Sequence, residues 1–339
     1  MQISEFCHGL FNVRRKGSGS KGKEARSENR EVRSQESEAR GKNREAGIMS
    51  IDEQSAVFRP AQRELSAMSC DGLFHDLALF LTEGKDGREA IIDLGEVEFI
   101  DPYGLGVICL IGRYIRGKFQ RATYRLPQDG RLRSYLQRMQ FTEAIDDSTA
   151  LEAGHSYGES DTLLEITKVE QRGDVDRLLE RINVRVEQIL TMELRYTVRE
   201  ITQFKSVISE LCHNILDHSV NWGYACAQRY MDRKRGKKFA TIGVVDLGIG
   251  IRASLSARFD TSKWTHGRAI LNAVKKDVSR EPERGLGLYV VRRICEDYDG
   301  SLQIRSGDTR VTFRGKRVME YRSAFFPGTQ VGIVLYGKE

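Results

Sequence analysis

Residues 210–218 hold the first side chains whose types and spacing could do chemistry. Glu210, Asn214 and His218 are four residues apart, so in a helix they share one face. An asparagine oxygen is a hard, neutral ligand for Mg²⁺ that leaves room for phosphate oxygens and water. A glutamate one turn earlier could accept a proton from water or from an attacking hydroxyl group. Taken alone, the segment is explained equally well by a solvated helix face.

A second candidate segment begins at Asp246, directly after the apolar residues of an expected strand. A carboxylate buried there needs a partner, because an unpaired buried charge is costly. The exocyclic amine of adenine would supply that partner. Gly248 and Gly250 follow, and glycines at alternate positions permit a close backbone approach and positive φ angles. An Asx turn after a strand is the structural alternative.

The third segment places two glycines at the start of an apolar helix. The N–H groups at a helix start are unpaired and lie at the positive end of the helix dipole, which suits a polyphosphate. The segment consists of Arg284, Gly285, Leu286, Gly287 and Leu288. Residues 252–284 also contain eight basic side chains, which fit a flexible lid over phosphates and fit a solvated surface nearly as well.

The elements expected to position these segments are helices at 197–219 and 286–298 and a strand that ends at Asp246. Elsewhere the pattern predicts strands at 90–94, 122–126, 162–169, 302–306, 310–313 and 329–336, and helices at 103–115, 132–139 and 175–190. The alternation of strands and helices before residue 146 is typical of a small α/β domain.

Composition divides the chain into four expected parts. Residues 1–48 form a basic tail that we expect to be disordered, because 14–46 has only four apolar residues with which to offset the ordering entropy. The α/β domain spans 56–146, a polar linker spans 147–160, and a second domain spans 161–339. Met49, just past the tail, is an alternative start of the chain.

The formal charge of +6 comes almost entirely from the tail. Residues 14–46 hold 11 Lys or Arg against 6 Asp or Glu, and the remaining chain has 43 basic and 42 acidic residues. The folded part therefore has no basic excess of the kind that favours nucleic-acid backbones. For the tail, a solvated segment of mixed charge is favoured over a nucleic-acid contact.

The six cysteines form neither a CxxC pair nor a Cys/His cluster, so we expect reduced thiols without a disulfide framework or zinc site. No apolar run reaches the length of a membrane span, and the amino end has no apolar signal region. The sequence therefore predicts a cytoplasmic protein that does not enter the membrane.

The order and spacing of the three segments resemble the GHKL superfamily, which includes gyrase, a heat-shock chaperone of the same fold, histidine kinases and MutL. The resemblance spans about residues 160–339. Glu210 and Asn214 match the N box of that superfamily. The first glycine box matches Asp246, Gly248 and Gly250, and the second matches Gly285 and Gly287.

This resemblance implies a Bergerat-type α/β sandwich, with a mixed sheet and helices on one face, that binds ATP and Mg²⁺. It implies that Asn214 binds the metal, Asp246 binds the adenine amine and Glu210 is the catalytic base. Thr329, in Gly328-Thr329, is similar to a threonine that assists adenine recognition, and His218 is similar to the end of the N box in anti-sigma kinases. The expected nucleotide-binding residues are Asn214, His218, Asp246, Gly248, Gly250, Arg284, Gly285, Leu286, Gly287, Leu288 and Thr329.

A second resemblance covers about residues 56–146. The run Ile-Asp-Leu-Gly-Glu-Val-Glu-Phe-Ile-Asp-Pro-Tyr-Gly-Leu-Gly at 92–106 is similar to the core of a STAS domain, the fold of anti-sigma factor antagonists. Phosphorylated antagonists carry an acceptor serine or threonine where this chain has Pro102 and Tyr103. A serine switch at that loop is therefore not expected, and Tyr103 is expected to pack rather than to accept phosphate.

Together these observations favour a regulatory protein in which binding and slow hydrolysis of Mg-ATP alter how the STAS-like domain or a partner protein is held. Two alternatives stay open: an anti-sigma-type Ser/Thr kinase acting on a partner in trans, and a nucleotide-dependent scaffold without catalysis. A histidine kinase is disfavoured, since the expected helix at 175–190 contains no histidine. That region could form a homodimer or pack on its own sheet.

Overall fold

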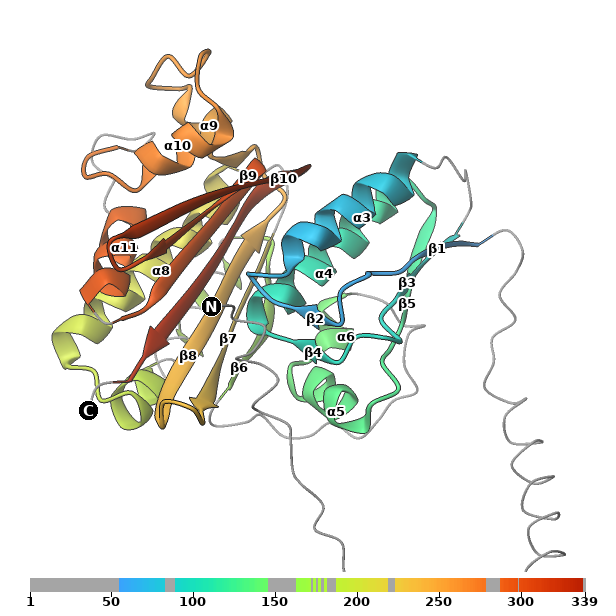
Figure 1. Cartoon of the computed structure of the whole chain (residues 1–339), viewed down its shortest axis with the longest axis horizontal. Coiled ribbons are helices and arrows are strands. Elements are labelled where there is room, and N and C mark those ends of the chain that lie inside the picture. The colour runs from blue at the N-terminus through green and yellow to red at the C-terminus, as the bar shows by residue number, and fades with distance from the viewer. Residues whose placement is uncertain are drawn as a thin grey trace, which may run out of the picture.

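The protein is described by a computed structural model. The described residues are 55–82, 89–145, 163–171, 173–174, 176–177, 180–181, 187–218, 223–278, 287–297 and 299–337. The predicted tail, the linker and half of the predicted helix at 175–190 lie outside these residues. Three sheets and the helices around them make up the described fold (Figure 1).

The amino-terminal part contains a three-stranded parallel sheet in the order β1-β3-β5 and a small parallel pair, β2 and β4. Its strands are β1 (Ala56–Phe58), β2 (Glu64–Leu65), β3 (Glu89–Asp93), β4 (Phe99–Ile100) and β5 (Arg121–Arg125). Its helices are α3 (Cys70–Thr82), α4 (Pro102–Arg116), α5 (Gly130–Arg138) and α6 (Phe141–Ala144). The predictions of β3, α4, β5 and α5 are confirmed, whereas α3 was not predicted.

The start of α4 follows from its local sequence. Asp101 is the N-cap, and its carboxylate accepts a hydrogen bond of 2.7 Å from the N–H of Gly104. Pro102 occupies the first helical position, where its missing N–H costs nothing. Arg113 and Arg116 lie in the last turn, where their positive charges interact favourably with the negative end of the helix dipole.

The carboxy-terminal part is built on a five-stranded sheet in the order β6-β7-β8-β10-β9. Its strands are β6 (Leu163–Val169), β7 (Gly223–Asp232), β8 (Lys237–Asp246), β9 (Ser301–Arg314) and β10 (Arg317–Tyr336). Every neighbouring pair of these strands is antiparallel, so the prediction of a mixed sheet was wrong. Two hairpins impose this pattern, since β7 turns directly into β8 and β9 turns directly into β10.

The predicted strands at 302–306 and 310–313 are one continuous strand, β9. Gly307, with a φ of 66°, lies between them and does not end the pairing with β10. The same hairpin extends β10 far upstream of the predicted start at 329. The break in β9 was predicted because Gly307 and Asp308 are residue types typical of a turn. The upstream part of β10 was missed because its largely exposed residues do not produce a clear alternation of apolar and polar side chains.

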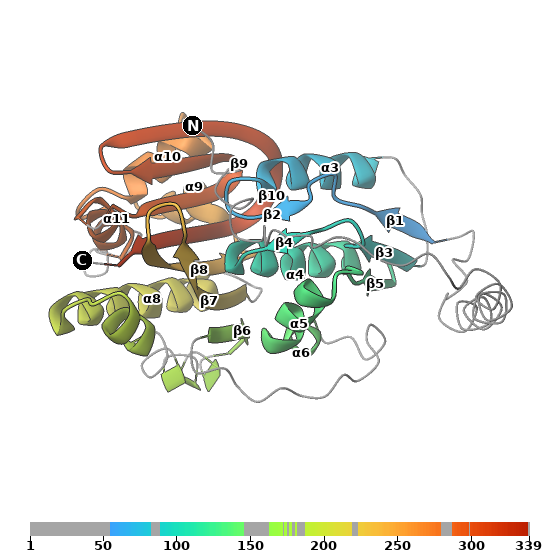
Figure 2. The ribbon, with the colours of Figure 1, turned by 60° about the horizontal axis from the view of Figure 1, so that its bottom comes forward.

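Helices cover one face of this sheet (Figure 2). They are η1 (Ile189–Glu193), α8 (Val198–His218), α9 (Gly250–Leu255), α10 (His266–Ala273) and α11 (Gly287–Asp297). The alternation of β8 sends Ala240, Ile242 and Val244 into the core beneath these helices. Among the described residues, no helix combines the length and the apolar character needed to cross a bilayer.

Helices α3 and α4 cover the opposite face of the sheet (Figure 2). We call α3, α4, β1, β3 and β5 together the amino-terminal layer. Val245 and Cys226 belong to the same hydrophobic core as this layer. The thiol of Cys226 donates to the main-chain oxygen of Pro102 at 3.0 Å, and the Tyr224 hydroxyl donates to Ala144 at 3.0 Å. The expectation of helices on only one face is therefore corrected, because an apolar second face needs its own cover.

Five of the six cysteines lie among the described residues. Within the described residues the five cysteines are buried and free of disulfides. They are Cys70, Cys109, Cys212, Cys226 and Cys295. Burial raises the pKa of each of these thiols, so they remain protonated and act as small apolar side chains.

Candidate functional site

Asp246 ends β8 on the face of the sheet that the helices cover. Its Oδ1 accepts hydrogen bonds from the N–H groups of Gly248 at 2.6 Å and Thr329 at 3.2 Å. Burial raises the pKa of this carboxyl to about 6, although both hydrogen bonds favour the charged form. Among the described residues Oδ2 makes no hydrogen bond, so it is placed to accept one from a ligand.

Two glycines with positive φ hold the backbone against this carboxylate. Gly328 has a φ of 81°, and a Cβ there would lie 2.0 Å from the main-chain oxygen of Asp246. Gly250 has a φ of 78°, and a Cβ there would lie 2.8 Å from Oγ of Ser306. That Ser306 hydroxyl accepts from Ile251 N–H at 2.9 Å and donates to the Gly328 oxygen at 3.1 Å. The glycines are thus required for two segments, distant in sequence, to meet.

Helix α8 carries the first predicted segment. It begins where the Thr197 N–H donates to the carboxylate of Glu200, and it ends at His218. Glu210 and Asn214 are half-buried and lie one turn apart on this helix, as the spacing predicted. The side chain of His218 lies outside the described residues.

The third predicted segment is described only in part. Helix α11 begins at Gly287, which confirms a glycine at the helix start, and Leu288 packs against the core beneath the helices. Arg284, Gly285 and Leu286 lie outside the described residues. Because α11 packs against α8, the structure places the first and third segments on neighbouring helices over the same face of the sheet.

Sequence reasoning missed several residues near this loop. A cavity of about 350 Å³ is lined in part by Gly250, Ser306, Gly328 and His266. Nδ1 of His266 makes a hydrogen bond of 2.7 Å with Oδ1 of Asp308. Isolated Ser, His and Asp residues in polar stretches give no spacing signal, so only the return of β9 beside α10 brings them together.

The Asp246 carboxylate fits as the hydrogen-bond acceptor for an adenine amino group. A carboxylate with one oxygen tied to two backbone N–H groups and the other unused by described residues can accept the exocyclic N–H of the base. For Mg²⁺, the described residues contain no group of three or more His, Cys, Asp or Glu side chains able to hold a metal. A half-buried Asn214 is consistent with the nucleotide-type site, in which Mg²⁺ takes one or two protein ligands and phosphate oxygens.

Comparison with protein families matches residues 200–318 to the family described as histidine kinase-, DNA gyrase B-, and HSP90-like ATPases. The matched range contains most of α8, the whole of β8 from Lys237 to Asp246, and α11. This match supports a GHKL-type ATPase domain over these residues, and ATP binding is consistent with such a domain. No curated protein sequence matches this chain. Thr329 and the amino-terminal layer lie outside the matched range.

Proposed function

We propose that this protein is a regulatory Mg-ATP-binding switch, in which nucleotide binding and slow hydrolysis change how the amino-terminal layer or a partner protein is held. The observation that carries the proposal is the Asp246 carboxylate, half-buried where β8 and β10 meet and fixed by Gly248 and Thr329. The same two strands support the amino-terminal layer on their other face. A ligand on one face is therefore separated from the contact on the other face only by the thickness of these two strands.

In this proposal Asp246 accepts a hydrogen bond from the adenine amine, and the main-chain N–H of Thr329 keeps that carboxylate oriented. Asn214 holds Mg²⁺, and Glu210 accepts the proton of the attacking water. The positive end of α11, beginning at Gly287, and residues 284–286 bind the phosphates. Bound Mg²⁺ would neutralise charge on the phosphates, while the protein supplies orientation and a base.

The amino-terminal layer is proposed to be a STAS-like domain. Its run 92–106 ends β3, forms β4 and begins α4, next to a parallel sheet. Tyr103, at the position where antagonists carry a phosphate acceptor, is only 1% exposed and faces the sheet. Burial also raises the pKa of its phenol, so it remains protonated. We therefore propose that the output is the docking of this layer and not its phosphorylation.

A second candidate is a Ser/Thr kinase that acts in trans. The buried Tyr103 favours an external substrate over an acceptor in this chain, if the ATP phosphate is transferred at all. The two candidates differ in the fate of the γ-phosphate, which is released to water in the first case and becomes bound to a protein in the second.

The test is a time course with ATP labelled on the γ-phosphate, in Mg²⁺, for the wild-type protein and for Glu210→Ala and Asn214→Ala. Both released phosphate and protein-bound label are followed. We expect the wild type to release free phosphate slowly. The rate should fall about 100-fold in Glu210→Ala, because a general base accelerates a reaction by about that factor. Mg-ATP binding should survive in Glu210→Ala and weaken in Asn214→Ala.

Matched controls come from other helices. Glu143→Ala removes an exposed carboxylate from α6, and Asn272→Ala removes an amide from α10 that contacts only Lys275 among the described residues. Neither should change turnover. Unchanged turnover in Glu210→Ala would exclude the catalytic role, and label retained on a partner protein would favour the kinase. Wild-type protein that binds no nucleotide would overturn the proposal.

A further inference from the structure

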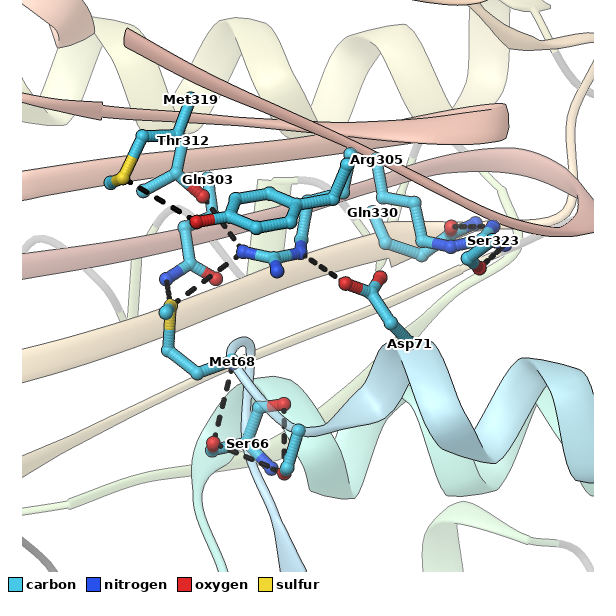
Figure 3. Close-up of polar contacts among 12 residues, drawn as sticks. Ser66, Met68, Asp71, Gln303, Arg305, Thr312, Met319, Ser323 and Gln330 are labelled. Atoms are coloured by element: carbon cyan, nitrogen blue, oxygen red, sulfur yellow. Dashed lines mark hydrogen bonds and ion pairs between the residues drawn. The ribbon is translucent and has the colours of Figure 1, made fainter. Parts of the chain in front are cut away.

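Arg305 is a buried guanidinium at the contact between the sheet and the amino-terminal layer. It lies on β9, is 1% exposed, and its Cζ is 3.7 Å from the ring centroid of Phe74 in α3. Its Nη2 donates to Ser323 Oγ at 3.1 Å and to the main-chain oxygen of Ala324, and its Nη1 donates to Gln330 Oε1 at 3.5 Å. Figure 3 shows Arg305 and Gln330 on the strands that face α3.

A buried arginine without a carboxylate is costly to maintain. Within the described residues no carboxylate lies within ion-pair distance of Arg305, and burial lowers the pKa of its guanidinium. Arg310, further along the same strand, instead forms an ion pair of 2.7 Å with Asp71 of α3. An apolar side chain of similar size would serve packing at least as well as an unpaired charge. Arg305 therefore calls for an explanation other than stability.

Gln330 connects Arg305 to the carboxylate-bearing loop. It is fully buried, and its Nε2 donates to the main-chain oxygens of Asp246 and Pro327, each at 3.0 Å. In the sheet its partners are Val245 on β8 and Arg305 on β9. A carboxamide has one acceptor and one donor group, so a guanidinium at Oε1 turns the NH₂ group toward the two carbonyls. Arg305 thus fixes the orientation in which Gln330 holds Asp246.

We propose that Arg305 and Gln330 are positioning residues for Asp246, and that through them the docked helix α3 sets the nucleotide affinity of the site. The contacts run from the Phe74 ring to the Arg305 guanidinium, from there to the Gln330 amide, and then to the main chain of Asp246. The inference rests on the proposed nucleotide-binding function. By linkage, nucleotide at Asp246 strengthens the docking of α3 by the same factor.

The test measures the dissociation constant of Mg-ADP by titration calorimetry, and the free energy of unfolding in urea, for the full-length chain. Arg305→Met keeps the packing volume and removes the donors to Gln330. Gln330→Glu keeps an acceptor for Arg305 but cannot donate to the Asp246 oxygen. We expect each variant to weaken Mg-ADP binding about 10-fold, which is within the usual range of coupling between sites. We expect Arg305→Met to be no less stable than the wild type.

Gln303→Leu is the matched control. Gln303 lies two residues before Arg305, on the same face of β9, is 4% exposed and contacts Met68, just before α3. It touches neither Gln330 nor Asp246 among the described residues, so Mg-ADP affinity should stay within about twofold of wild type. Phe74→Leu, made on the opposite side of the contact, should weaken Mg-ADP binding although it is remote from the nucleotide.

The outcomes separate the two proposals. If wild-type protein binds Mg-ADP and Arg305→Met binds it equally well, the positioning role is wrong while the proposed function stands. If Gln303→Leu weakens binding as much as Arg305→Met, the effect belongs to the whole contact and not to this pair. If the wild type binds no nucleotide, the proposed function fails and the positioning role fails with it. Should Arg305→Met not fold, Gln330→Glu and Phe74→Leu decide the matter.

Discussion

Gly243 in β8 lies directly beneath the backbone of Tyr103 in α4. A Cβ on the glycine would be 2.8 Å from Cα of Tyr103 and 2.9 Å from the main-chain oxygen of Pro102. Both contacts are with backbone atoms, which cannot move aside as a flexible side chain could. The first turn of α4 therefore rests on the sheet at a point where only a hydrogen atom fits.

Gly243→Ala should weaken the docking of the amino-terminal layer. We expect the free energy of unfolding to fall by about 1–3 kcal/mol, the usual cost of overpacking a core. Urea unfolding followed by circular dichroism measures this. Gly130→Ala is the control, because a Cβ at Gly130 has no heavy atom within 4 Å. Equal stability of the two variants would show that α4 does not depend on this close approach.

The Asp101 carboxyl should make the free energy of unfolding depend on pH. Burial raises the pKa of its carboxyl to about 7 in the folded protein, whereas an unfolded aspartate titrates near 3.8. The folded state then holds the proton more tightly, so stability falls as pH rises from about 4 to about 7 and is constant above that. Asp101→Asn keeps an oxygen for the Gly104 N–H and removes the titration.

The measurement is urea unfolding of the wild type and of Asp101→Asn between pH 5 and pH 8. The wild type should lose stability relative to the variant as the pH rises, by up to about 3 kcal/mol over this range. Asp93, whose pKa is lowered by its arginine partners Arg59 and Arg125, does not interfere, because it is ionised in both the folded and the unfolded state over this range. A stability difference that does not change with pH would contradict the prediction.

Asp246→Asn should separate nucleotide binding from folding. Asparagine can still accept the Gly248 and Thr329 N–H bonds, but its NH₂ group would face the adenine amine. We expect Mg-ADP affinity at pH 8 to fall about 10- to 100-fold, the value of a hydrogen bond to a charged group. Stability at pH 8 should rise, because the folded pKa of about 6 means that ionisation of this carboxyl opposes folding.

The same carboxyl predicts a pH dependence of binding. As the pH falls through about 6, protonation of Asp246 should weaken Mg-ADP binding in the wild type. Asp246→Asn should show none of this dependence between pH 5 and pH 8. Titration calorimetry at each pH gives both results, and a pH profile shared by the two proteins would assign the titration to another group.

Gly328→Ala tests whether the close contact between residue 328 and Asp246 contributes more to stability and binding than the positive φ of the glycine does. Its φ is 81°, and the added Cβ would meet the main-chain oxygen of Asp246 at 2.0 Å. Gly315 has a φ of 52°, but a Cβ there has no heavy atom within 4 Å. Gly328→Ala should lose both stability and Mg-ADP binding, whereas Gly315→Ala should lose only about 1 kcal/mol of stability. Thermal unfolding and calorimetry distinguish the two effects.

Local sequence determined the parts of the fold that depend on near neighbours in the chain. The four-residue spacing placed Glu210 and Asn214 one turn apart on α8, and the apolar residues within 103–115 indicated α4. The apolar run before Asp246 identified the end of β8. Periodicity and capping act over a few residues, so a single sequence is enough to reveal them.

Only the tertiary structure decided which distant residues meet. The insertion of β10 between β8 and β9 brought Thr329 to Asp246, and it made antiparallel a sheet that was expected to be mixed. The docking of α3 and α4 on the second face of the sheet buried Arg305 against Phe74. Strand order and the packing of layers depend on the burial of apolar surface summed over the whole chain. No local pattern in the sequence records that sum, so these contacts could not be predicted from it.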